Sequence, residues 1–243
     1  MTLPAVLTIA LLVAEVAAVV LAVRARVGHP LVVLLAFALL DELAVLGLHA
    51  ILAHAPRPIA GWWRVPYHVE TAFVLGWPCL LAAVCWQAKA PRSVVLAGLE
   101  NGKARSLSSG GTDARAGVDQ DGARRPFVNG LLGAYLGALG GLIAAYPIDA
   151  SGSGAPRLRW IFLGWEVACV AAAWWGLWRA RLRPWGAVER CLVILVSCET
   201  MVATVGPFAS DPFTRWWIAR CFYLAAWSAV CGVLARPIRP AAS

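Results

Sequence analysis

The sequence predicts an all-α membrane protein: a single domain, residues 1–243, built as a bundle of seven transmembrane helices. Composition is the first reason, because 60% of the 243 residues are hydrophobic and only 14% are charged. An average soluble domain is about half apolar and about a quarter charged. The second reason is that the apolar residues come in runs of about 20, which is the length that crosses a hydrocarbon core of roughly 30 Å.

The first apolar run covers about residues 3–23 and ends at Arg24, Arg26, Gly28 and Pro30. It has neither the basic start nor the small-residue cleavage site of a signal peptide, so we expect it to stay as a helix. The six further predicted helices cover about residues 31–53, 65–86, 127–147, 160–178, 187–207 and 216–235.

A polar stretch, residues 89–125, separates the third and fourth runs. It is rich in Gly, Ser, Asp and Arg and has no aromatic residue, so it cannot bury a core, and we predict a mobile inner loop. All seven cysteines fall inside apolar runs, which does not favour a disulfide framework.

The basic residues set the orientation, since Lys and Arg gather on the cytoplasmic side of membrane proteins. If the N-terminus is outside and the C-terminus inside, eight basic residues lie inside and five outside, leaving out the 89–125 loop. This predicts a multi-pass protein of the plasma or inner membrane, whose partner is the lipid bilayer. Membrane topology also explains the net charge of +8, so we expect no nucleic-acid binding.

Glycines recur about one turn apart in the predicted helix 127–147. Gly133, Gly137 and Gly141 form two successive GxxxG patterns. Small residues at this spacing let two helix backbones approach closely. The pattern therefore predicts close packing within the chain or, alternatively, a homo- or hetero-oligomer formed through this helix.

Ionisable residues inside the apolar runs are the strongest functional signal, because such groups are costly in a bilayer and often mark function. The stretch 41–70 is the richest, and similar groups recur in later runs. Five predicted helices bring groups to the outer half of the membrane: His49, His68, Glu70, Glu166, Glu199 and Arg220. Three more lie nearer the midplane: Glu15, Asp41 and Glu42.

Three interpretations of these groups stay open. The first is a structural network in which Arg220 pairs with Glu199, Glu166 or Glu70, because buried charges need partners. The second is a metal site with His49, His68 and carboxylates, a ligand set that suits Zn, Fe, Cu or Mn, although no HExxH or paired ExxH motif is present. The third is a proton path or a ligand pocket.

Retinal is not expected as a cofactor, although seven helices with an outer N-terminus invite comparison with microbial rhodopsins. The last predicted helix, 216–235, has no lysine for a Schiff base, and the only lysines are Lys89 and Lys103. Helix number alone does not indicate function.

The leading functional hypothesis is therefore a non-enzymatic membrane protein with an outward-facing polar pocket. It would bind or conduct a small ligand, a proton or a metal ion. One alternative is a membrane metalloenzyme acting on a lipid-soluble substrate, with His49 and His68 as ligands and a glutamate as base. The other is an accessory subunit of a larger membrane complex.

Overall fold

The computed structural model describes residues 3–55, 61–87, 129–140, 156–179, 186–205, 208 and 212–236. These residues form helices and short connections without any strand, which confirms the predicted all-α class. The helices are α1 (Leu3–Arg24), α2 (His29–Leu52), the short 3-10 helix η1 (Gly61–Trp63), α3 (Arg64–Gln87), residues 129–140, α6 (Pro156–Arg179), α7 (Ala187–Val205) and α8 (Pro212–Leu234). The predicted loop 89–125 lies outside the described residues.

The turn between α1 and α2 shows how the local sequence ends a helix. The amide of Val27 bonds the carbonyl of Ala22, and the amide of Arg26 bonds that of Val23, which is the Schellman pattern. Arg26 occupies the left-handed position of this motif, with φ of 50°, where glycine is usual.

Five helical stretches are long and apolar enough to cross a membrane: Ala5–Arg24, His29–Leu52, Gly61–Gln87, Ile161–Arg179 and Trp216–Leu234. α7 is not one of them, since it carries Glu189, Arg190 and Glu199 within 19 residues. The described residues 129–140 are shorter than a crossing requires. Seven crossings and their orientation therefore stay a prediction.

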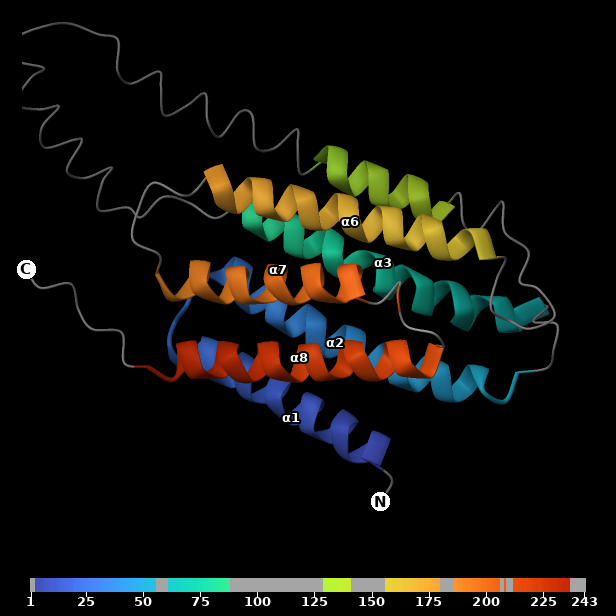
Figure 1. Cartoon of the computed structure of the whole chain (residues 1–243), viewed down its shortest axis with the longest axis horizontal. Coiled ribbons are helices and arrows are strands. Elements are labelled where there is room, and N and C mark those ends of the chain that lie inside the picture. The colour runs from blue at the N-terminus through green and yellow to red at the C-terminus, as the bar shows by residue number, and fades with distance from the viewer. Residues whose placement is uncertain are drawn as a thin grey trace, which may run out of the picture.

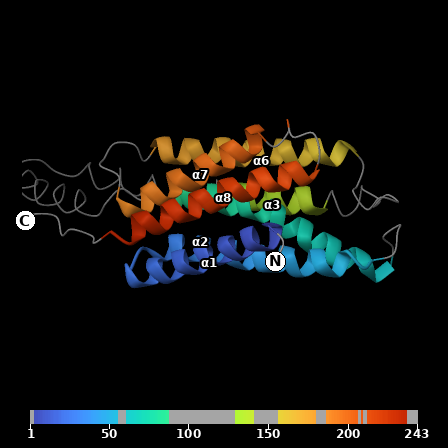
Figure 2. The same cartoon turned by 60° about the horizontal axis from the view of Figure 1, so that its bottom comes forward.

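Six of the helices form a closed ring. Each packs against two neighbours in the order α1, α2, α3, α6, α7, α8 and back to α1, and α3 also touches α7 across the ring. The helices run side by side in Figures 1 and 2, and α1 begins well short of the end of the bundle where α3 begins. α1 and α8, the first and last described helices, are direct neighbours.

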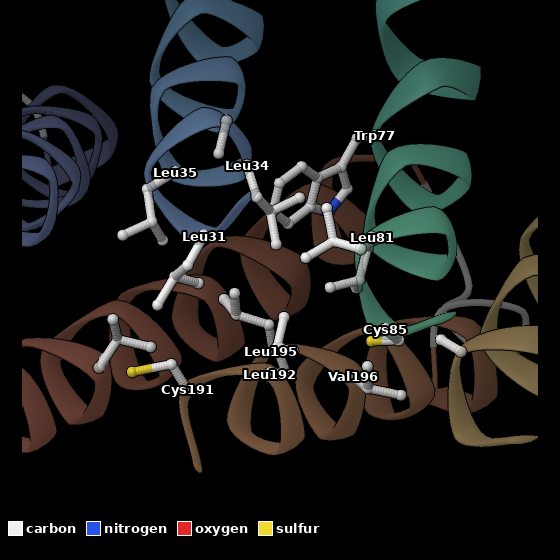
Figure 3. Close-up of a cluster of buried hydrophobic side chains, with 14 of the residues drawn as sticks. Leu31, Leu34, Leu35, Trp77, Leu81, Cys85, Cys191, Leu192, Leu195 and Val196 are labelled. Atoms are coloured by element: carbon white, nitrogen blue, oxygen red, sulfur yellow. The ribbon is translucent and has the colours of Figure 1, made fainter. Parts of the chain in front are cut away.

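The apolar core fills the inside of this ring. Its largest members come from α1, α2, α3, α7 and α8, and several of them meet in Figure 3: Leu31, Leu34, Leu35, Trp77, Leu81, Leu192, Leu195 and Val196. Indole N–H groups fasten α3 to α6, because Trp86 donates to the carbonyl of Ala172 at 2.8 Å and Trp165 to that of Leu75 at 2.9 Å.

The helix 129–140 packs against α3 and α6 through one face. The hydroxyl of Tyr135 donates to the carbonyl of Ala72 at 2.9 Å, and its ring lies 6.4 Å from that of Trp165. Gly133 and Gly137 are each two residues from Leu131 or Tyr135, about 200° around the helix. They are exposed, and an added Cβ would meet no described atom within 4 Å.

The prediction of close packing within the chain is therefore wrong for Gly133 and Gly137, because Tyr135 fixes the rotation of this helix and turns the glycines away. Gly141 lies outside the described residues. The oligomer alternative stays a prediction.

Candidate functional site

Ionisable and hydrogen-bonding side chains from all six ring helices interact inside the bundle through hydrogen bonds, an ion pair or their charges. They do not share one height, because α1 is shifted along the bundle and Ala14 lies beside Cys231, three turns beyond Arg220 in α8. We call this set the polar layer: Glu15, Asp41, Glu42, Trp77, Glu166, Glu199, Arg220 and Tyr223. Of the predicted site residues, it contains all except Glu70, His49 and His68.

Arg220 is the only cation of the polar layer, and its side chain is paired. It forms a salt bridge with Glu42 of α2, although the whole residue is only 7% exposed. Its guanidinium also lies 5.2 Å from the ring centroid of Trp216, one turn earlier in α8. The pair satisfies both groups inside the bundle, as a buried charge requires.

The expected partners of Arg220 were Glu199, Glu166 or Glu70, so the observed bond to Glu42 corrects that prediction. From their positions in the predicted helices, Glu42 was expected near the midplane of the membrane and Arg220 in its outer half, so the two were not expected to pair. The closed ring instead turns this face of α2 toward α8, and the long arginine side chain spans the remaining distance.

Glu199 is the most buried carboxylate of the layer, with 2% of its surface exposed. It accepts hydrogen bonds from the indole Nε1 of Trp77 on α3 and from the hydroxyl of Tyr223 on α8. One turn beyond Tyr223, the ring of Trp227 lies 6.3 Å from that of Trp77. Glu199 thus links three helices, and its charge has two donors to satisfy it.

Sequence reasoning missed Trp77 and Tyr223. Both belong to predicted helices, but neither carries a charge, and a charge was the only signal used. Their positions in the middle of apolar runs, away from the ends where Trp and Tyr usually gather, could have identified them.

Glu15 and Asp41 each have an oxygen that lacks a hydrogen-bond partner among the described residues. These atoms are Oε2 of Glu15 and Oδ1 of Asp41, and both are buried. The charges of Glu42, Arg220 and Asp41 act on Glu15, so its side chain faces the layer. The charges of Glu42, Glu199 and Arg220 act on Asp41 in the same way.

Glu166 belongs to the layer through its electrostatic interaction with Glu199. Glu70 is half-buried nearer the start of α3 and has an interaction of its own there. The half-buried ring of His68 packs edge-on against Tyr67, 5.6 Å between centroids. The side chain of His49 lies outside the described part of the structure.

A metal site is not visible among the described side chains, since no three His, Cys, Asp or Glu residues there come together as ligands. The predicted site depends on His49, so it remains untested. Apart from Glu166, which has an interaction of its own, four carboxylates of the polar layer face a single arginine, and this excess of acid has to be balanced by protons or by a bound cation. Comparison with protein-family models, with curated proteins and with solved structures finds no match, so the chemistry rests on this geometry alone.

Proposed function

We propose that the chain is a non-enzymatic, multi-pass membrane protein that binds a small cation, either a proton or a metal ion, in the polar layer. The observation that carries this proposal is the imbalance between four carboxylates (Glu15, Asp41, Glu42 and Glu199) and one arginine among the described side chains of the layer. Buried ionisable groups of this kind recur in proton relays and ion pathways of membrane proteins. Conduction of the same cation would need only a path from this layer to each end of the bundle.

The proposed bilayer is supported by the outside of the ring. Large apolar side chains point outward along α1 and α2, including Val13 (63% exposed) and Val33 (56% exposed). Soluble monomers rarely expose continuous apolar surface of this extent, whereas lipid covers it without cost. The excess of basic residues at the inner ends supports an outer N-terminus.

The test is cation uptake by the full-length protein reconstituted into lipid vesicles. A pH-sensitive dye inside the vesicles reports protons, and dyes selective for Na⁺, K⁺ or Zn²⁺ report metal ions. We expect Glu15→Gln, which removes a buried carboxylate whose Oε2 has no described partner, to abolish or slow the uptake seen with the wild type. Glu189→Gln is the control, because Glu189 lies in the first turn of α7, outside the layer. Unchanged uptake in a folded Glu15→Gln protein would contradict the proposal.

A second candidate is a subunit of a larger membrane complex or a homo-oligomer. It is favoured by Gly133 and Gly137, which are exposed on the helix 129–140 and have open space beside them. Gly137→Ile would block a close helix contact there without disturbing the ring. Cross-linking in native membranes should then lose the higher-mass species formed by the wild type, and an identical pattern for both proteins would exclude this face.

A further inference from the structure

We infer that the cation is a proton, and that Glu15 and Asp41 are the two groups that take it up and release it. This inference rests on the function proposed above and makes its substrate specific. The step is simple protonation: a carboxylate oxygen accepts H⁺ and becomes a neutral carboxylic acid, and it loses the same proton on release.

Glu15 is assigned as a proton-binding group because its side chain is buried and one of its carboxylate oxygens lacks a hydrogen bond from any described residue. Only 4% of its surface is exposed, and Oε2 has no hydrogen-bond partner among the described residues. The turns before and after it in α1 bury Leu11 and Ala18. α8 covers the same part of α1, where the thiol of Cys231 lies 3.4 Å from the carbonyl oxygen of Ala14. An ionised carboxylate is costly in such a place unless something neutralises it.

Asp41 is the second group because it, like Glu15, has a buried carboxylate oxygen that accepts no hydrogen bond from a described residue. Its Oδ1 is buried without a described partner, and it is adjacent in sequence to Glu42, whose carboxylate Arg220 already holds. It interacts with the charges of Glu42, Glu199 and Arg220, and its own charge reaches Glu15. A proton bound at one of the two carboxylates therefore changes the field at the other.

A metal ion fits this place poorly. Ca²⁺ takes six to eight oxygen ligands and Mg²⁺ an octahedron, whereas the described residues supply two unpartnered buried side-chain oxygens. Glu42 is bound to Arg220, and Glu199 already accepts two hydrogen bonds. A proton needs only one oxygen and removes the charge outright.

Several other titratable or charged groups also influence how protonation of Glu15 and Asp41 depends on pH. The titratable or charged groups around the pair are Asp41, Glu42, Arg220 and Cys231 for Glu15, and Glu15, Glu42, Tyr135, Glu199 and Arg220 for Asp41. On α3, which also packs against α2, Glu70 and His68 lie nearer the end of the bundle.

The experiment is infrared difference spectroscopy of the reconstituted full-length protein across a pH step, in H₂O and in D₂O. Protonated carboxyl groups absorb apart from carboxylates, and their band shifts on deuteration. We expect the wild type to show such a band, Glu15→Gln and Asp41→Asn each to lose part of it, and Glu189→Gln to keep all of it. Calorimetry with Na⁺, K⁺, Mg²⁺ and Zn²⁺ on the same samples should give no binding that depends on Glu15.

The possible results distinguish a failure of the proton assignment from a failure of the proposed cation site. Stoichiometric binding of one of these metal ions that is lost in Glu15→Gln would overturn the proton assignment and leave the proposed cation site standing. A wild-type spectrum without a deuteration-sensitive carboxyl band, together with no metal binding, would overturn both. Absence of the band in the wild type is decisive by itself, so a variant that fails to fold does not prevent the proposal from being overturned.

Discussion

At Gly176, α6 passes directly over the backbone of α3, so adding one methyl group here is a sharp test of the packing. A Cβ at this position would lie 2.9 Å from Cδ1 of Trp86 and 3.0 and 3.1 Å from the carbonyl carbon and oxygen of Cys85. Ordinary carbon contacts are about 3.5–4.0 Å, so the two helices would have to separate by roughly 0.5–1 Å. That movement also pulls on the bond from Trp86 to Ala172.

Overpacking of a closed interior costs about 1–3 kcal/mol. Two of the three close atoms at Gly176 are backbone atoms that cannot rotate away, so we expect Gly176→Ala to cost about 2–3 kcal/mol. The assay is the free energy of unfolding in mixed detergent micelles, followed by circular dichroism.

The matched control is Gly164→Ala, about 18 Å away along the same helix, where an added Cβ meets no described atom within 4 Å. Alanine is the better helix former, so this change should be neutral or stabilise by about 1 kcal/mol or less. Equal stability of the two variants would refute the close approach of α3 and α6.

Three further predictions use the same unfolding assay. Glu42→Gln leaves the Arg220 charge buried without its counter-charge and should lower the free energy of unfolding by about 3–5 kcal/mol. The double variant that also has Arg220→Gln should recover part of this stability. Equal losses in the single and double variants would argue against the pair. Trp77→Phe removes an N–H donor from Glu199 and should cost about 1–3 kcal/mol, whereas no loss would show that this bond is not formed. Arg26→Gly relieves a left-handed φ of 50° and should stabilise the protein by about 1 kcal/mol, so destabilisation would contradict the Schellman turn.

Runs of apolar residues were enough to place the helices. The six whose bounds are described begin and end within about four residues of the expected segments, because helix length and hydropathy are local properties of the chain. Local sequence also indicated which charges matter, since Glu15, Glu199 and Arg220 are all buried.

The pairing of those charges could not be read in the same way. Whether Arg220 meets Glu42 or Glu199 depends on the order of helices around the ring, which is set by contacts between segments far apart in sequence. The rotation of the helix 129–140 is a similar case, because Tyr135, and not the glycine spacing, decides which side faces α3.

The closure of the ring by α1 and α8 also has a consequence for synthesis. A chain emerging from the ribosome exposes Glu15, Asp41 and Glu42 long before α8 brings Arg220, the one cation of the polar layer. Until that last described helix arrives, the early hairpin carries acidic groups without a counter-charge, and α1 lacks half of its neighbours. The acidic groups of α1 and α2 therefore gain their counter-charge only when α8 joins the ring, so closure of the ring and neutralisation of these groups happen in the same step.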